Sequence, residues 1–230
     1  MSTTTDTFST GDAWGDALRD HLNGRPVADL ILEVDDGSTR PAMHPEWFFR
    51  DFPDWEPEEQ HLMRRVEDGP VLDLGSGAGR LSLHLQSNGL AVTAIESSVG
   101  AAEVSRQRGV VDTRVQDLND PPDDKRWRTV LLSCGNLGLG GSWEGNRRLL
   151  IRLAKLCAPG ALLLGDSVNY TGPAEIGLRI RYGNMATPWW RQRNVASNEI
   201  EALARGTGWV VAEQIEAPNG FDHYAALVRE

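Results

Sequence analysis

The sequence predicts a doubly wound α/β fold in which a mostly parallel sheet of seven strands has an antiparallel last strand. From Gly69 onward, apolar runs of strand length alternate with stretches of helical periodicity. This alternation is typical of βαβ units, whose strands lie parallel and whose helices cover the sheet. Near the C-terminus, the link Pro218-Asn219-Gly220 is too short for a helical crossover, so the strands on either side of it are expected to pair antiparallel.

The alternating part is expected to contain five strands, and two further strands follow at the C-terminus. The helical period is clearest around Leu149–Leu156, and Pro159-Gly160 is expected to stop that helix. A later helix at about 196–207 leads to the C-terminal pair. The expected strands are Val71–Leu74, Ala91–Ile95, Val110–Val115, Thr129–Ser133, Ala161–Gly165, Trp209–Glu216 and Tyr224–Arg229, with helices near 78–88, 98–108 and 144–157 between the first five.

Two segments lie outside this alternation and are expected to cap the core. Residues 1–60 form an N-terminal cap or extension, and residues 61–230 form the core with an inserted cap segment at about 168–195. A helix over Ala13–Leu22 and a strand over Leu30–Val34 that enters a hairpin turn are expected in the N-terminal part. Residues 1–12 are rich in Ser, Thr and Asp, and we expect them to be frayed.

The composition is that of a globular protein and argues against several classes of partner. The 230 residues include 23 basic and 33 acidic side chains, a net charge of −10, so neither nucleic acid nor an anionic membrane is expected to bind. The chain has no apolar run of membrane-spanning length and no secretory signal pattern, so a cytoplasmic location is expected. Cys134 and Cys157 show no zinc-binding spacing, and no metal is expected.

A glycine-rich turn follows the first strand of the alternating part. It contains Gly75, Gly77 and Gly79 and is preceded by Asp73. Glycines allow a ligand to approach the backbone closely, and the N-terminus of the following helix offers free N–H groups. Arg80 occupies the last position of the dinucleotide pattern GxGxxG, where a small residue is needed, which disfavours an NAD-dependent oxidoreductase.

Acidic residues stand at the ends of the next two strands. Glu96 follows Gly75 by 21 residues, where a carboxylate accepts both hydroxyls of a ribose. Asp117 follows the third strand and is placed to accept from an adenine amino group beside the apolar Leu118. These groups share the carboxyl edge of the sheet, which is where open α/β sheets bind ligands.

Together these residues resemble the class I S-adenosylmethionine-dependent methyltransferases. The resemblance covers residues 70–165, and more loosely 60–230, and includes Leu156–Leu163, which is similar to the family pattern LxPGGxLL. It implies a Rossmann-like sheet and S-adenosyl-L-methionine as cofactor. The implied cofactor-binding residues are Gly75, Gly77 and Gly79 at the methionyl part, Asp73 at its amino-acid end, Glu96 at the ribose, Asp117 and Leu118 at the adenine, and Ser133 at the end of the fourth strand, where such enzymes position substrate.

The fourth strand end does not identify the acceptor. The segment Ser133-Cys134-Gly135-Asn136 lacks the (Asn/Asp)-Pro-Pro-aromatic motif of adenine- and amide-modifying members, and it lacks the aspartate of metal-dependent O-methyltransferases. Cys134 is interpreted as a buried apolar cysteine rather than a nucleophile, because the sequence places no histidine to activate it.

The two cap segments are the candidates for the substrate site. They hold eleven of the sixteen aromatic residues, and they form either small satellite cores at the sheet edges or a cap that excludes water. In the insertion, residues 176–182 alternate with period two, and Pro188–Arg193 is expected to return as the paired strand. Four arginines against Glu175 give this insertion a local charge of +3, which suggests an anionic group on the substrate; they are Arg179, Arg181, Arg191 and Arg193.

The expected activity is transfer of a methyl group to an O, N or C nucleophile of a small-molecule metabolite. If the acceptor must lose a proton, a histidine is suited to act as the base, and His44 is preferred over His61 and His223 because it precedes the capping aromatics. Alternatives are a protein of the same fold that binds S-adenosylmethionine but catalyses a non-methylating reaction, a non-catalytic partner of another enzyme, and an NAD-dependent oxidoreductase.

Overall fold

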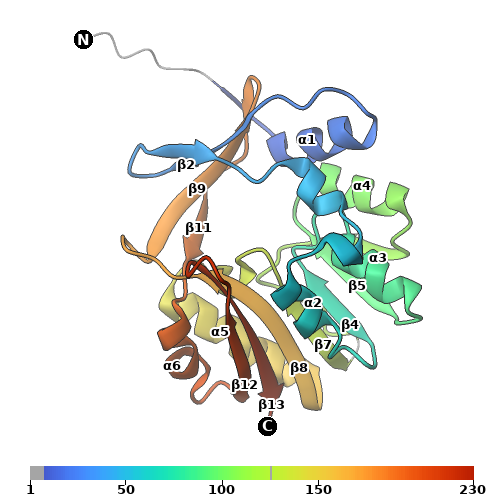
Figure 1. Ribbon diagram of the computed structural model, residues 1–230, viewed down its shortest axis with the longest axis vertical. Coiled ribbons are helices and arrows are strands. Elements are labelled where there is room, and N and C mark those ends of the chain that lie inside the picture. Colours follow the sequence, from blue (N-terminus) through green and yellow to red (C-terminus); the bar gives the residue numbers. More distant parts are fainter. Residues whose placement is uncertain (1–7, 125) are drawn as a thin grey trace.

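The computed structural model describes residues 8–124 and 126–230. In this part of the chain, a seven-stranded main sheet has the order β12-β13-β8-β7-β4-β5-β6 (Figure 1). Strand β13 runs antiparallel to both of its neighbours, and the other strands are parallel to one another. The strands are β4 (Val71–Leu74), β5 (Val92–Glu96), β6 (Asp112–Val115), β7 (Trp127–Leu132), β8 (Cys157–Val168), β12 (Trp209–Glu216) and β13 (Asp222–Arg229). The predicted fold class is confirmed.

Helices cover both faces of the main sheet because successive apolar side chains of each strand point to opposite faces of the sheet. Leu72 and Leu74 of β4 belong to the apolar cluster that contains the residues of α5 and α6. Val71 belongs instead to the cluster that α2 and α3 form on the opposite face. The helices are α2 (Pro57–Met63), α3 (Arg80–Ser87), α4 (Val99–Arg108), α5 (Trp143–Leu156) and α6 (Ile200–Ala204). The glycine-rich turn and the ends of β5 to β8 therefore lie at one edge of a covered sheet.

Strand β8 is longer at both ends than the predicted Ala161–Gly165. The helix before it ends at Leu156 as expected, but the strand begins at Cys157, and the exposed residues Pro159 and Gly160 lie within its bounds. The pairing of β8 with β7 shifts in register between Trp127 and Thr129, so the extra residues are absorbed as an irregularity of the ladder. Helix α6 is shorter than predicted because a 3₁₀ turn, Ser197–Glu199, replaces its first residues.

The N-terminal segment and the insertion join in a second sheet, which we call the cap sheet. Its central strand β9 (Glu175–Tyr182) pairs antiparallel with β2 (Leu30–Val34), and Leu32 lies opposite Ile180. Figure 1 shows β2 and β9 at the end of the molecule opposite the C-terminus. The remaining strands are β1 (Ser9–Thr10), β3 (Thr39–Pro41), β10 (Met185–Ala186) and β11 (Trp190–Arg193). The predicted hairpin and returning strand are confirmed, and the two caps form one layer rather than separate satellite cores.

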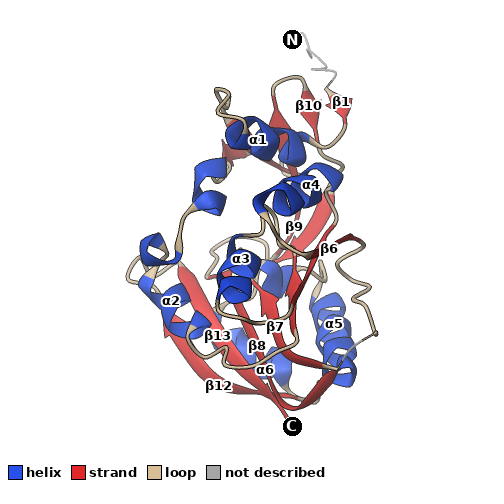
Figure 2. Ribbon diagram, turned by 90° about the vertical axis from the view of Figure 1, so that its right-hand side faces the viewer, coloured by secondary structure: helices blue, strands red, loops and turns tan. Residues whose placement is uncertain are grey.

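The first residues that the structure describes are held in place rather than frayed. Ser9 and Thr10 pair with β10, and Asp12 accepts the first capping hydrogen bond of α1 (Ala13–Leu22) from Gly15. Residues 1–7 lie outside the described part of the chain. Two 3₁₀ helices follow the hairpin, η1 (Pro45–Phe49) and η2 (Phe52–Asp54). Figure 2 shows α1 beside α4, so the N-terminal segment covers the part of the core that carries the glycine turn.

Candidate functional site

The glycine turn needs its glycines for two different reasons. Gly75, Gly77 and Gly79 all have left-handed φ angles, of 80°, 54° and 78°. A Cβ on Gly75 would overlap the amide of Asn136, and one on Gly79 would lie 2.6 Å from Ser105 Oγ. A Cβ on Gly77 would meet only Phe48, at 3.8 Å. The outer glycines therefore permit close packing, while the buried Gly77 has room beside its Cα, because only Phe48 approaches that position.

Glu96 connects this turn to the start of α4. Its side chain is 6% exposed; Oε2 accepts the N–H of Gly77 at 2.8 Å, and Oε1 accepts the N–H of Ser98 at 2.9 Å. Burial raises the pKa of Glu96, against the opposing effect of these N–H donors. The Ser97 hydroxyl also donates to Oε1, at 3.3 Å. A carboxylate has about four acceptor positions, so one remains for a ligand hydroxyl, and a second ligand hydroxyl can bind where it replaces that of Ser97.

Asp73 is the second buried carboxylate beside the turn. It is 2% exposed and accepts a 2.6 Å hydrogen bond from the Ser82 hydroxyl. Burial raises the pKa of Asp73 to about 6; Ser82 opposes the rise and the negative charge of Glu96 adds to it. Two buried acids so close together favour a ligand that carries positive charge.

Asp117 and Leu118 follow β6 at the same edge. The N–H of Gln116 donates to the carbonyl oxygen of Glu96 at 3.1 Å, which holds the ends of β5 and β6 together. Asp117 is exposed, and its Oδ1 accepts the N–H of Asn119 at 2.9 Å. Leu118 packs against the main core and lies within 3.6 Å of the position of a Cβ on Gly75. The structure thus brings Asp73, the glycines, Glu96 and Leu118 together, with Asp117 at the rim.

The turn after β7 is held by Asp166, which the sequence analysis did not identify. The two carboxylate oxygens of Asp166 accept the N–H groups of Cys134 and Gly135, each at 2.7 Å. Burial raises the pKa of Asp166 to about 7, although both N–H donors lower it. The signal for this residue was its position, because it directly follows the fifth predicted strand, Ala161–Gly165, at the ligand-binding edge. Asn136 completes the turn by donating to the carbonyl oxygen of Leu74 at 3.0 Å.

Cys134 is exposed, so its interpretation as a buried cysteine was wrong. Its backbone has a left-handed φ of 63°, which is uncommon for a residue with a side chain. The hydrogen bonds from Cys134 and Gly135 to Asp166 stabilise that conformation. The cysteine is therefore a turn residue at the edge of the site rather than part of the core.

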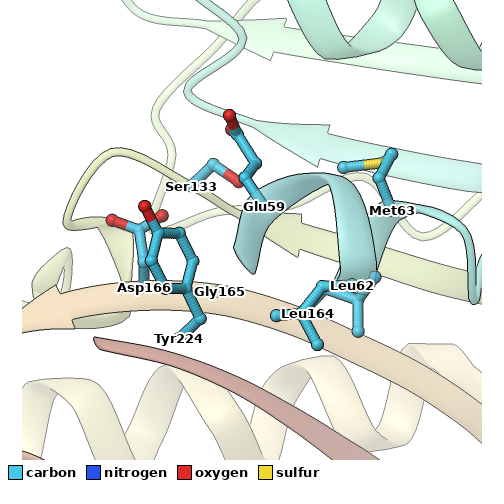
Figure 3. Close-up of a pocket in the computed structure, with 8 residues that line it drawn as sticks. All are labelled: Glu59, Leu62, Met63, Ser133, Leu164, Gly165, Asp166 and Tyr224. Carbon is cyan, nitrogen blue, oxygen red and sulfur yellow. The ribbon is translucent and has the colours of Figure 1, made fainter. Parts of the chain in front are cut away.

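Ser133 and Asp166 line a cavity of about 10 Å³, the size of one water molecule. Figure 3 shows Asp166 beside the Tyr224 ring, with Ser133 and Glu59 near them. Leu62, Met63, Leu164 and Gly165 complete the lining. Burial raises the pKa of Tyr224, so its phenol stays protonated at neutral pH. Polar groups from α2, β8 and β13 thus meet beside the turn after β7.

Arg80, directly after the last glycine, is held by the N-terminal segment. Its guanidinium forms two hydrogen bonds to the Glu59 carboxylate, at 2.8 and 2.6 Å. The rings of Trp47 and Trp55 lie 3.8 and 4.3 Å from it. The Arg80–Glu59 ion pair is almost completely buried, and the large Arg80 side chain therefore packs toward α2 rather than into the glycine turn.

The cap sheet is attached to the same turn. Gln192 of β11 donates to the carbonyl oxygen of Gly135 at 2.7 Å. The arginines expected to attract an anion instead form ion pairs: Arg179 and Arg181 with Glu33, Arg191 with Asp35, and Arg193 with Glu199. These pairs remove the local positive charge that suggested an anionic substrate.

The three candidate histidines lie in different surroundings. His44 is exposed, caps η1 by accepting the N–H of Glu46 at 3.3 Å, and has its ring 6.1 Å from that of His21. His61 pairs with Glu213 at 2.8 Å. His223 is buried with Nε2 2.7 Å from the carbonyl oxygen of Val195, and burial lowers its pKa. His223 therefore serves the packing of β13.

Residues 8–124 and 126–230 contain no group of three or more His, Cys, Asp or Glu side chains arranged to hold a metal ion. None of the helices in these ranges combines the length and apolar character needed to cross a membrane.

The fold is that of S-adenosylmethionine-dependent methyltransferases. A methyltransferase of this kind from Bacteroides fragilis, solved with S-adenosyl-L-homocysteine, is 24% identical, with 97% of this chain and 98% of that chain covered and a TM-score of 0.83. The CcbJ methyltransferase from Streptomyces caelestis is 15% identical over 77% of this chain and 94% of its own, with a TM-score of 0.60. CalS10, an amino pentose methyltransferase from Micromonospora echinaspora, is 13% identical over 78% and 94%, with a TM-score of 0.56. No protein-family model and no curated protein matches the sequence.

Proposed function

We propose that this protein is an S-adenosylmethionine-dependent methyltransferase that acts on an O, N or C nucleophile of a small molecule. The observation that carries the proposal is the buried Glu96 carboxylate, bonded to Gly77 of the glycine turn at the edge shared by β4 to β7. The fold of the solved methyltransferases supports it, because the match with the Bacteroides protein extends over the cap sheet as well as the core.

The residues of the turn fit the proposed cofactor. Gly77 has room beside its Cα, and the buried Ser76 hydroxyl has no hydrogen-bond partner among the described residues. Glu96 has one free acceptor position for a ribose hydroxyl and a second where a ribose hydroxyl replaces that of Ser97, and Asp73 is placed to favour the positively charged amino-acid end. Leu118 offers an apolar surface for the adenine ring, and the exposed Asp117 offers a hydrogen-bond acceptor at the rim of the site. Ser133 directly follows β7, which is the neighbour in the sheet of β4, the strand that leads into the glycine turn.

When bound, S-adenosylmethionine supplies a methyl group activated by the adjacent sulfonium charge for in-line displacement. The task of the chain is to align the acceptor and to exclude water, and good alignment lowers such barriers by several kcal/mol, up to about 7–11 in ideal cases. The turn after β7 is suited to alignment because Asp166, Leu74 and Gln192 all fix it. The cap sheet is suited to exclude water.

A base is required only where the acceptor must lose a proton during transfer. His44 is one candidate, and it lies on the exposed end of η1. Asp166 is the other, because it lies at the end of β8 beside Ser133 and its pKa of about 7 suits proton transfer at neutral pH.

The base is identified by pH–rate profiles of two variants once an acceptor is found. If Asp166 is the base, Asp166→Asn lowers kcat by about 10²–10⁴-fold and removes the acidic limb of the profile. His44→Ala then keeps the wild-type rate, which excludes His44. The opposite pattern assigns the base to His44 and excludes Asp166.

A small molecule is the substrate class that the cap and the charge favour. The net charge of −10 disfavours nucleic acid, and the cap sheet is attached through Gln192 to the turn after β7, where we expect the acceptor. Proteins of the same fold include an amino pentose methyltransferase and a glycopeptide N-methyltransferase, MtfA, which is 21% identical over 79% of this chain. Because the cap arginines are paired with acids, an anionic group on the substrate is not required.

The proposal is tested by calorimetric titration with S-adenosylmethionine, S-adenosylhomocysteine and NADH. We expect micromolar binding of the first two, no binding of NADH, and a loss of at least about tenfold in Glu96→Ala, equal to about 1.4 kcal/mol. Glu201→Ala, which removes an exposed carboxylate on α6, is the control and should bind as the wild type does. Folded wild-type protein that binds neither S-adenosyl compound would overturn the proposal.

A further inference from the structure

One carboxylate, that of Asp12, holds the N-termini of two helices that are far apart in the sequence. We propose that Asp12 is a positioning residue for the cofactor site: it latches the N-terminal segment, α1 and η1, over the glycine turn, so that cofactor enters and leaves only when this latch opens. The inference rests on the proposed function, because it assumes that the turn binds an S-adenosyl compound.

The latch consists of hydrogen bonds from both helices to the same side chain. Asp12 Oδ1 accepts the N–H of Gly15 in the first turn of α1 at 3.0 Å. Its two oxygens lie 2.7 and 2.8 Å from the Ser98 hydroxyl, and Oδ2 accepts the N–H of Gly100 at 2.7 Å. Ser98 is itself the N-cap of α4. A negative charge at two helix N-termini is favourable because their free N–H groups and dipoles point toward it.

The helices approach so closely at this point that only glycines fit. A Cβ on Gly15 would lie 2.6 Å from Gly100 Cα, and one on Gly100 would lie 2.8 Å from Gly15 Cα. Arg19 of α1 adds an ion pair to Glu103 of α4 at 3.3 Å. The contact between the two helices is therefore specific rather than a loose covering.

A single residue, Ser98, connects Asp12 to Glu96, the carboxylate that we propose binds the ribose. Ser98, which donates its hydroxyl to Asp12, also donates its N–H to Glu96 at 2.9 Å. Glu96 in turn accepts the N–H of Gly77. Asp12, Ser98, Glu96 and Gly77 thus form a continuous hydrogen-bonded chain from the N-terminal segment to the glycine turn.

The same segment packs over that turn, in which Gly77 is buried. Phe48 of η1 is the nearest side chain to Gly77, and Trp14 of α1 lies edge-on against it with ring centroids 4.8 Å apart. Arg108 of α4 donates to the carbonyl oxygens of Phe48 and Ala78, at 3.0 and 2.7 Å. Ala78 and Leu18 are completely buried in the small core beneath these rings. A ligand on Gly77 and Glu96 therefore lies under the N-terminal segment.

A latch and a simple support for Glu96 predict different binding kinetics. If α1 must move away before ligand exchange, weakening the latch raises the open fraction and speeds both association and dissociation. If Asp12 only orients Glu96, its loss speeds dissociation and leaves association unchanged. The two rate constants for S-adenosylhomocysteine, measured by stopped-flow tryptophan fluorescence, therefore separate these roles without any acceptor substrate.

The variants are Asp12→Ala and the nearly isosteric Asp12→Asn. For Asp12→Ala we expect both rate constants to rise by about tenfold, the factor that corresponds to the loss of helix capping, with a smaller change in Kd. Asp12→Asn keeps one acceptor oxygen, so its rate constants should fall between those of Asp12→Ala and the wild type. Asp36→Asn is the matched control, because it removes a carboxylate from the exposed β2–β3 turn of the same segment; it should leave both rates unchanged.

Three outcomes have distinct meanings. Unchanged rates in both Asp12 variants, or faster dissociation with unchanged association, would overturn the latch. Wild-type protein without binding would overturn the proposed function instead. If Asp12→Ala does not fold, hydrogen exchange of the wild type decides the matter: the Gly15 and Gly100 amides should exchange more slowly with S-adenosylhomocysteine bound, and equal exchange with and without it overturns the latch.

Discussion

At the scale of single residues, the site is defined by carboxylates that the fold keeps out of water. Asp73, Glu96 and Asp166 each lie among the last three residues of a strand of the main sheet, and each is held by donors of the neighbouring backbone or a serine. Burial raises the pKa of all three because the ionised form loses hydration. A ligand with positive charge offsets that cost, which is the physical argument for the proposal that these acids favour S-adenosylmethionine.

Asp73 should make cofactor binding depend on pH. Its pKa is about 6, so at pH 7.5 it is mostly ionised and attracts the positive charge, while at pH 5 it is mostly protonated and does not. We expect the Kd for S-adenosylmethionine to rise about tenfold from pH 7.5 to 5, since affinity follows the ionised fraction. Calorimetric titration at four pH values measures this.

The matching variant is Asp73→Asn, which removes the titrating group and keeps an acceptor for the Ser82 hydroxyl. Its affinity should be lower at pH 7.5 and should vary little down to pH 5. The same pH dependence in Asp73→Asn as in the wild type would assign the titration to another group.

At the scale of elements, the buried Glu59–Arg80 pair joins α2 to α3, and Trp47 and Trp55 stack on the guanidinium. Glu59→Gln removes the compensating charge and leaves Arg80 buried without it, so the free energy of unfolding should fall by about 3–5 kcal/mol. Urea unfolding followed by tryptophan fluorescence measures the change.

Two further variants distinguish charge from packing at this contact. The double variant Glu59→Leu with Arg80→Met replaces both charges by apolar groups and should recover most of the lost stability. Asp68→Asn breaks the exposed pair with Arg128 and should cost less than about 1 kcal/mol. If Glu59→Gln alone also cost less than that, the buried pair would not stabilise the α2–α3 contact.

At the scale of the whole molecule, the raised pKa values of Asp73 and Asp166 set the pH dependence of stability. A carboxyl whose folded pKa lies above its unfolded value stabilises the protein when protonated, and this stability is lost as pH rises through the folded pKa. The free energy of unfolding should therefore fall from about pH 4 to 7, by about 3 kcal/mol for Asp73, whose pKa rises from 3.8 to about 6.

Other acids limit this trend at low pH. Against the effect of burial, Arg179 and Arg181 lower the pKa of Glu33, and the Ala196 N–H and Arg193 lower that of Glu199. The stability from these interactions is therefore lost as pH falls below about 4. Urea midpoints at unit steps from pH 4 to 8 should therefore show a maximum near the acid end. A midpoint that rises steadily from pH 5 to 8 would contradict the prediction, and Asp73→Asn should flatten the curve.

Local patterns in the sequence were sufficient for most elements of the fold. Helix Ala13–Leu22 and strands Val71–Leu74 and Trp209–Glu216 have the predicted bounds, because apolar periodicity and flanking turn residues are properties of neighbouring positions. The glycine turn and Glu96 were found in the same way, since parallel strands bring their carboxyl ends to one edge whatever surrounds them. The sequence by itself therefore determined the class of fold and the edge of the sheet that carries the candidate site.

Contacts between distant segments decided the rest. The cap charges are neutralised because Glu33 meets Arg179, 146 residues away, and no local pattern records that pairing. Asp12 accepts a hydrogen bond from the Gly100 N–H, 88 residues away. Asp166 of β8 holds the turn at Cys134 and Gly135, which follows the neighbouring strand β7. Only the tertiary structure decided these roles, because a carboxylate acquires its hydrogen-bond partners and its pKa from whatever the folded chain places within about 3 Å of it.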